Sequence, residues 1–353
     1  MDTDDLRIRR WGDVGDGYLG PAFTAHFSPG QILYGSRRTY LRKVAVADFE
    51  GVCANTTFVL EPSSSDLLSS FLPFVMTTER FHEHSIKQSK GSVNPYINYR
   101  DLTWYEFRLP PVDEQERLVE VLRSAAAHVD GLLAAMQGAW TLYRSHVEDM
   151  LAHFDAQRLV SLATESGVIA GPFGSQLHAH EYVEGGIPLL NPLDMQFDRL
   201  KRFPTTTIPE DFVSRFPQYE LREGDLVFAR RGDLDKRVRI TASEAGWILG
   251  SDCVRVRLRE PGLAPFLLHA TIQRDAFGWV TQHSTRTTMP GTSTTTVGQM
   301  PIRLPPPEEA VAIRSALDSS RDLVSTIERS IVCARDVSSR LTNWCLERAG
   351  DVH

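Results

Sequence analysis

The strongest constraint on this chain is an apolar stripe that runs through residues 113–154. Pro110 and Pro111 end any preceding helix, and Asp113 stands where an N-cap belongs, with Glu116 three residues further on. Beyond them, apolar residues recur every three or four positions, which is the period of a helix with one apolar face. Such a helix would be about 60 Å long at 1.5 Å per residue. A seam this long and narrow needs a partner helix.

A matching stripe closes the chain. After Pro305, Pro306 and Pro307, apolar residues again step by three and four as far as Cys345, with two serines that weaken the stripe. The two stripes predict two long helices that pair as a coiled-coil spacer, and a pair of core helices in an ordinary bundle is the alternative. The residues predicted to pair are Leu122, Val129, Leu133, Met136, Trp140, Leu317, Val324, Ile327, Ile331 and Leu341.

The two halves of the chain are copies of each other. Residues 28–43 match residues 222–236, so that Gly30 falls on Gly224 at a shift of 194. Leu109-Pro110-Pro111 falls on Leu304-Pro305-Pro306 at a shift of 195. Each half reads as a strand-rich mixed globule, then a proline stop, then a long helix. The predicted order is globule 1–111, helix 112–156, globule 157–305 and helix 306–353, in the α+β class.

Short β-rich runs after glycine turns predict the strands of each globule. These runs are residues 31–34, 44–46, 57–60, 225–229, 238–240 and 254–258. Residues 67–86 and 263–280 are predicted to be helical. The Ser/Thr-rich residues 284–297 predict a surface loop that leads to a final strand.

The first copy is predicted to begin partway into the repeat. Leu6 matches Leu200, whereas the counterpart of Gly171 would fall before Met1. The first globule would therefore lack an opening segment of several tens of residues. The alternative is that the first copy has merely diverged.

Basic residues recur at matching places in both copies. Arg37 and Arg38 follow a glycine-turn strand, as do Arg230 and Arg231, and arginine forks suit phosphates and guanine edges. The turn that ends at Gln176 is rich in glycine and could approach DNA closely, although a simple β-turn is an equal alternative. A solvated rim of internal ion pairs is the alternative for the basic residues. The predicted DNA contacts are Arg37, Arg38, Arg42, Lys43, Lys90, Ser175, Gln176, Lys201, Arg202, Arg230, Arg231, Lys236, Arg237 and Arg286.

Other classes of function find little support in the sequence. The four cysteines have no metal-ligand or disulfide spacing, which favours a reducing cytoplasm and no metal site. No apolar run reaches the length of a membrane span, and the first residues do not form a signal peptide. Asn94-Pro95-Tyr96-Ile97 lacks the second proline of the adenine-methyltransferase motif. We therefore predict no enzyme, and the net charge of −7 neither requires nor excludes DNA binding.

Four features together resemble the specificity (S) subunit of type I restriction–modification systems. They are Gly171-Pro172-Phe173-Gly174-Ser175, the Gly224-Asp225-Leu226-Val227 strand followed by Arg231-Gly232-Asp233, the Leu109–Gln115 junction, and the duplicated order of globule and helix. The resemblance covers nearly the whole sequence. Glu308-Glu309-Ala310 departs from the Glu-Gln expected at the second junction, and the short first globule departs more seriously.

The resemblance implies a non-catalytic DNA-reading adaptor. Each globule would be a target recognition domain for one half of a split site in double-stranded DNA, and two antiparallel helices would separate the domains. Partners would be methylation subunits, expected to number two, and restriction subunits. S-adenosylmethionine, ATP and magnesium would belong to those partners, so no cofactor is expected in this chain. The alternative is a shortened assembly or regulatory protein that binds methylation subunits without reading a full site.

Overall fold

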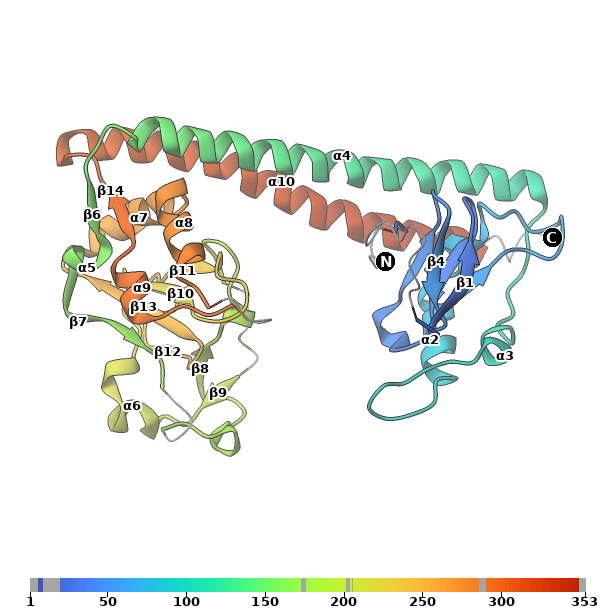
Figure 1. Ribbon diagram of the computed structural model, residues 1–353, viewed down its shortest axis with the longest axis horizontal. Helices are drawn as coiled ribbons and strands as arrows, with labels where there is room; N and C mark the ends of the chain where they lie inside the picture. Colours follow the sequence, from blue (N-terminus) through green and yellow to red (C-terminus); the bar gives the residue numbers. More distant parts are fainter. Residues whose placement is uncertain are drawn as a thin grey trace. The chain divides into compact units, whose positions relative to one another are not determined.

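The computed structural model describes residues 6–8, 20–172, 176–200, 204, 206–285 and 290–348. The chain divides into two compact units, of which unit 1 comprises Met1–Gln137 and Thr326–His353 and unit 2 comprises Gly138–Ser325. Both predicted long helices form: α4 spans Val112–Leu151 and α10 spans Pro307–Arg348 (Figure 1). Each unit thus contains one strand-rich globule and a part of each long helix, which confirms the predicted α+β class.

Helix α4 begins at Val112, two residues before the start that an N-cap at Asp113 would give. The carbonyl oxygen of Pro111 accepts hydrogen bonds from the backbone N–H groups of Glu114 and Gln115, both at 3.0 Å. Asp113 therefore lies inside the first turn and is not the N-cap. A carboxylate there is still favourable, because the helix dipole is positive at this end.

In the described part of unit 1, the globule contains two small antiparallel sheets, three short α-helices and one 3-10 helix. The strand order is β3-β2-β5 in one sheet and β1-β4 in the other. The elements are β1 (Phe23–Phe27), β2 (Ile32–Gly35), η1 (Thr39–Leu41), β3 (Val44–Val46), β4 (Gly51–Ala54), β5 (Thr57–Leu60), α1 (Leu72–Val75), α2 (Glu79–Lys87) and α3 (Tyr99–Leu102).

Strand β2 is buried on both faces. Ile32 and Tyr34 pack with Phe81 of α2, whereas Leu33 points the other way and packs with Phe27 of β1. This alternation follows from the two-residue period of a strand. The hydroxyl of Tyr34 is hydrogen-bonded to the hydroxyl of Ser85, so its polar end is satisfied inside the core.

The globule of unit 2 is larger. Its sheets have the orders β11-β10-β13-β7, β12-β8-β9 and β14-β6. The strands are β6 (Ala156–Arg158), β7 (Ala163–Ala170), β8 (Ile187–Leu190), β9 (Thr207–Ile208), β10 (Leu226–Ala229), β11 (Arg237–Arg239), β12 (Ile248–Leu249), β13 (Cys253–Leu258) and β14 (Pro301–Arg303). The helices are α5 (Leu159–Leu162), η2 (Ala179–Glu181), η3 (Pro192–Asp194), α6 (Asp211–Arg215), η4 (Pro217–Tyr219), η5 (Pro261–Leu263), α7 (Ala264–Ala270), α8 (Arg274–Gln282) and α9 (Thr294–Gly298).

The strand pairing shows that the two globules share one frame. Leu33 of β2 lies opposite Ala45 of β3 and Val59 of β5. In the same way, Val227 of β10 lies opposite Val238 of β11 and Arg255 of β13. In unit 2 the sheet continues from β13 to β7, whereas β5 pairs only with β2 among the described strands of unit 1.

Three predicted elements differ in detail. Residues 67–86 and 263–280, each predicted as helical, both break into two helices. In unit 1 the break lies at Thr78, whose side chain accepts a hydrogen bond from the N–H of Phe81 and starts α2. Within the predicted loop 284–297, the hydroxyl of Ser293 accepts from the N–H of Thr296 and starts α9 in the same way.

The long helices run antiparallel within each unit. In unit 1, Leu122 near the start of α4 packs with Cys345 near the end of α10. In unit 2, a hydrogen bond of 2.6 Å joins Nδ1 of His146, near the end of α4, to the hydroxyl of Ser320 in the first half of α10. Five of the residues predicted to pair are buried, namely Leu122, Val129, Leu317, Val324 and Ile331, and the other five are half-buried.

Candidate nucleic-acid interface

The turn after β10 holds the predicted arginine pair of unit 2. The N–H of Thr292 donates to the carbonyl oxygen of Arg230 (2.8 Å), and the N–H of Gly232 donates to that of Pro290 (2.9 Å). Between these two bonds, Arg231 lies opposite Gly291 in an antiparallel bridge. Gly232 has a φ of 79°, a left-handed conformation that glycine adopts without strain. The turn is therefore fixed against the segment that leads into α9.

A surface hollow of about 370 Å³ lies at this turn. Its lining combines the guanidinium, imidazole and hydroxyl groups of Arg230, Arg231, His283, Thr285, Thr292, Ser293 and Thr296 with the backbone of Gly291. The imidazole of His283 stacks on the ring of Trp279 with 3.8 Å between centroids. The side chain of Arg231 is 59% exposed and has Asp252 as its ion-pair partner at 3.6 Å. Guanidinium and hydroxyl groups are the donors and acceptors that suit base edges and phosphates.

Unit 1 repeats this arrangement bond for bond. The N–H of Ile97 donates to the carbonyl oxygen of Ser36 (3.0 Å), and the N–H of Arg38 donates to that of Pro95 (2.6 Å). Arg37, between them, lies opposite Tyr96. The Asn-Pro-Tyr-Ile segment is thus a structural part of this loop, and the side-chain oxygen of Asn94 accepts from Nε of Arg38 at 2.9 Å.

These bonds correct the match between the two arginine pairs by one residue. Arg37 corresponds to Arg231, whereas Arg38 corresponds to Gly232 and Arg230 to Ser36. Arg38 has a φ of 53°, the same left-handed conformation that glycine adopts in unit 2. Only one arginine of each pair therefore occupies an equivalent place.

Lys43 and Lys236 are equivalent in the structure, as the sequence predicts. The carbonyl oxygen of Lys43 accepts from the N–H of Gly35, and that of Lys236 accepts from the N–H of Ala229, both at 2.9 Å. The ammonium group of Lys236 donates to the carbonyl oxygen of Pro192 at 3.1 Å. Both lysines are half-buried at the sheet edge.

Other predicted contacts already have partners within the chain. Arg42 is paired with Glu79 and holds the pKa of that carboxyl below its usual value. Lys90 lies 2.8 Å from Asp101. Gln176 accepts a hydrogen bond of 2.9 Å from the hydroxyl of Tyr219. Ser175, Lys201, Arg202 and Arg286 lie outside the described residues.

Arg237 is inside the globule and not on its surface. It is 3% exposed, its guanidinium lies 4.6 Å from the ring centroid of Phe197, and its Nη1 donates to the carboxylate of Asp235 at 3.1 Å. Burial lowers its pKa. A side chain with so little exposed surface cannot contact DNA, so Arg237 is not part of the interface.

The hollow also contains residues that the sequence did not single out. The predicted surface loop 284–297 supplies Thr285, Gly291, Thr292 and Ser293. Its Ser/Thr content was visible in the sequence, but its position beside Arg231 depends on contacts between distant segments. In unit 1 the corresponding missed residue is Tyr96.

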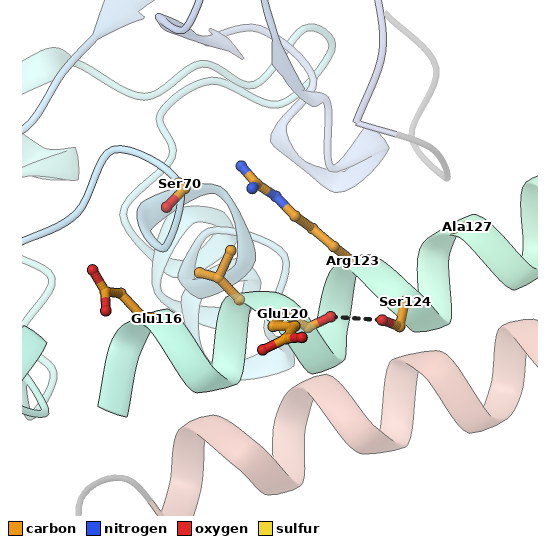
Figure 2. Close-up of a pocket in the computed structure, with 7 residues that line it drawn as sticks. Ser70, Glu116, Glu120, Arg123, Ser124 and Ala127 are labelled. Carbon is orange, nitrogen blue, oxygen red and sulfur yellow. Dashed lines mark hydrogen bonds between the residues drawn. The ribbon is translucent and has the colours of Figure 1, made fainter. Parts of the chain in front are cut away.

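A second surface depression, of about 470 Å³, lies in unit 1 along the first turns of α4 (Figure 2). Figure 2 shows Ser70 approaching it from the segment before α1, whereas the other labelled residues come from α4. It is lined by Ser70, Glu116, Val119, Glu120, Arg123, Ser124 and Ala127. Two carboxylates accompany its single guanidinium, so this depression offers no excess positive charge to a phosphate. It is therefore not part of the candidate interface.

The described ranges contain no group of three or more His, Cys, Asp or Glu side chains placed to hold a metal ion. No helix within the same ranges is long and apolar enough to cross a membrane.

The known proteins that the chain resembles belong to type I restriction–modification systems. No protein-family model matches the chain. Over 151 residues it is 28% identical to the EcoDI specificity subunit of a type I restriction enzyme from Escherichia coli. The matched region covers 41% of this chain and 33% of that protein. The chain thus matches only a third of the length of this curated relative.

Solved structures extend the likeness to the fold. A chain in a structure of the type I restriction–modification system aligns with a TM-score of 0.56 at 19% identity, over 95% of this chain and 85% of that one. The HsdS subunit from Thermoanaerobacter tengcongensis aligns with a TM-score of 0.41 at 18% identity, over 92% and 81%, which is too low for an argument. In part of its sequence the chain is therefore similar to the specificity subunit of a type I restriction enzyme, and in its fold it is similar to a chain of a type I restriction–modification system.

Proposed function

We propose that the chain is the sequence-specific DNA-binding subunit of a type I restriction–modification complex. The observation that carries this proposal is the duplicated frame. In both globules a glycine-turn strand leads to an exposed arginine, Arg37 or Arg231, which is fixed opposite a second loop segment. Two equivalent readers in one chain suit a DNA target with two separate halves.

Local arrangement, and not net charge, supports the DNA contact. The chain carries a net charge of −7, so it has no general attraction for phosphates. The hollow at Arg231 nevertheless combines a guanidinium fork with hydroxyl groups within one small surface. Contacts of such groups with phosphates give affinity that falls with salt, and contacts with base edges give sequence choice.

The chain itself would be non-catalytic and would work in the cytoplasm. Methylation subunits, two per complex, would bind to it together with restriction subunits, and these partners would supply S-adenosylmethionine, ATP and magnesium sites. Helices α4 and α10 would serve as the connection between the two readers, since each contributes to both units. On this proposal, each globule is a target recognition domain.

The direct test is to map methylated positions in DNA exposed to the complex of this chain with its methylation subunits. A split motif with modified bases in both halves is expected. A stable complex that leaves DNA unmodified and binds all sequences equally would contradict the proposal and favour an assembly role.

Arg231→Ala tests the reader in unit 2. Loss of one base contact should cost about 1–3 kcal/mol of binding and relax the preference at one half-site only. Arg259→Ala is the matched control, because Arg259 is also exposed in unit 2 but does not line the hollow. Equal motifs for both variants and the wild type would remove Arg231 from the readout.

A further inference from the structure

Tyr96 and Gly291 occupy the same place in the two globules. Tyr96 lies opposite both Arg37 and Lys90 in antiparallel bridges. Gly291 lies opposite Arg231. On its other side, the carbonyl oxygen of Gly291 accepts from the N–H of Thr285 (2.9 Å), and the N–H of Gly291 donates to the hydroxyl of Thr285 (3.0 Å). The two residues thus share the backbone bridge to the arginine, and on the other side each bonds to a residue before the loop, Lys90 in unit 1 and Thr285 in unit 2.

In unit 1 this position carries a projecting aromatic ring between two cations. Residues directly opposite in an antiparallel pair point to the same face, so Arg37, Tyr96 and Lys90 share one surface. Tyr96 is 41% exposed, and the guanidinium carbon of Arg37 lies 6.0 Å from its ring centroid. Lys90 is fixed by its ion pair with Asp101. An exposed ring beside a guanidinium can make apolar contact with a base while the guanidinium of Arg37 faces a phosphate.

In unit 2 the same position is open. A Cβ atom at Gly291 would lie 3.3 Å from the hydroxyl oxygen of Thr285 and 3.6 Å from the carbonyl oxygen of Arg230. Gly291 is not among the glycines with positive φ, so the backbone itself would accept a larger residue. The missing side chain therefore leaves the hollow open and exposes Arg231 and the neighbouring hydroxyls from the side.

We propose that Tyr96 and Gly291 set the difference in base preference between the two half-sites. Tyr96 contacts the methyl group of a thymine in the half-site read by unit 1. Gly291 admits a base edge in the other half-site, where Arg231 and the hydroxyls of Thr285 and Ser293 hydrogen-bond to it. A thymine methyl is the apolar feature of the major groove, and guanine offers the two acceptors that fit an arginine fork. This inference rests on the proposed DNA-reading function.

The test uses the full complex with its methylation subunits and a randomised double-stranded DNA library. Tyr96→Ala should lower the preference for thymine at one position of one half-site about tenfold, and Tyr96→Phe should keep it, because the ring and not the hydroxyl makes the contact. Trp104→Ala is the matched control, since Trp104 is an exposed aromatic residue of the same globule outside this pair. The other half-site should not change in any of these variants.

Gly291→Tyr tests the hollow. It should weaken binding about tenfold or more and alter the motif only in the half-site read by unit 2. Gly262→Tyr adds the same ring at an exposed position with nothing within 4 Å, so it should leave both half-sites unchanged.

The outcomes separate this inference from the proposed function. If the wild-type complex selects no split motif, the DNA-reading function itself fails. If it selects one, and Tyr96→Ala and Gly291→Tyr leave that motif unchanged, the function stands and the inference is overturned. A change in both half-sites with either variant would also overturn it, because each position belongs to one globule.

Discussion

The two globules share a strand frame, but they meet the long helices with different chemistry. In unit 1 the contact around α1 is apolar: Phe71 and Phe74 pack with Val119 and Leu122 of α4. In unit 2 the corresponding contact is polar, because His269 stands at the place of Phe74 at the 195-residue shift of the helix junctions. The same fold therefore accepts two kinds of junction.

The polar junction in unit 2 is a chain of hydrogen bonds. The hydroxyl of Tyr143 on α4 donates to Nδ1 of His269 (2.6 Å), and Nε2 of His269 donates to Asp318 of α10 (2.9 Å). Burial lowers the pKa of His269, in keeping with a neutral ring that donates at one nitrogen and accepts at the other. Nearby, Arg321 of α10 forms a bidentate pair with Asp198.

The two contacts differ in how strictly they define the orientation of the globule on the helices. Apolar packing depends on area and tolerates small shifts, because the hydrophobic effect has no direction. A buried hydrogen-bonded network demands one geometry, since a group that loses its partner inside the protein is costly. We expect the junction of unit 2 to be the more specific and the more easily broken by one substitution.

The largest effect is expected at the buried ion pair of unit 2. Arg321→Met should lower the stability of unit 2 by about 3–5 kcal/mol, because it leaves the carboxylate of Asp198 largely buried without its cation. Arg7→Met is the control in unit 1, where the pair with Asp130 is exposed and worth about 1 kcal/mol or less. Hydrogen exchange resolved by unit measures both. Equal losses in the two variants would contradict the comparison.

The next effect concerns the two helix starts. The side chain of Gln115 is fully buried and accepts from the N–H of Leu68 (2.9 Å) while donating to the carbonyl oxygens of Asp66 (2.6 Å) and Pro110 (2.8 Å). Ala310 occupies its place in unit 2 and forms no such bonds.

Gln115→Ala should therefore destabilise unit 1 by about 2–3 kcal/mol, because three bonds are lost and buried backbone groups lose their partner. Ala310→Gln should change unit 2 by less than about 0.5 kcal/mol, since this half-buried site is not built around an amide. Denaturant unfolding monitored in each unit compares the two, and a cost below 1 kcal/mol for Gln115→Ala would show that these bonds contribute little.

The smallest effect is a pH dependence in unit 1. Helices α2 and α8 are both nine residues long, and His82 of α2 corresponds to Phe277 of α8. His82 is 4% exposed, and its pKa is lowered to about 4, chiefly by burial. The positive charge of Arg42 also lowers this pKa, whereas the negative charge of Glu79 raises it.

An unfolded histidine titrates near 6.5, so the unfolded chain binds more protons than the folded one between pH 6.5 and 4. The stability of unit 1 should be full above this window and should fall by about 1–2 kcal/mol between pH 7 and 5. His82→Phe, which copies unit 2, should remove most of that loss. Thermal unfolding at both pH values measures it, and an unchanged pH dependence in the variant would exclude His82 as its source.

Local sequence patterns predicted much of the fold. The proline stops and the three-and-four spacing predicted α4 and α10, and the β-rich runs after Gly30 and Gly224 predicted β2 and β10 close to their observed bounds. Details that depend on single caps were missed, such as the start of α9 at Ser293. A cap is one hydrogen bond, and a Ser/Thr-rich segment offers many places for it.

The candidate site was predicted only in part, because its geometry depends on long-range contacts. The sequence predicted Arg37 and Arg231 as DNA contacts. It matched the pair Arg37 and Arg38 to the pair Arg230 and Arg231, which is one residue off, and it placed Arg237 on the surface. The bonds from Arg38 to Pro95 and from Gly232 to Pro290 settle the match, and each joins segments far apart in the chain.

The sequence by itself determined the duplication, the two long helices and the strands β2, β3, β5, β10, β11 and β13, because these follow from spacing and local backbone preference. The tertiary structure alone decided that Tyr96 and Gly291 lie opposite Arg37 and Arg231, and that Phe74 and His269 contact the long helices. It also decided that Arg237 is buried. Side-chain partners across distant segments depend on register and packing, and a small shift in register changes every neighbour that a residue meets.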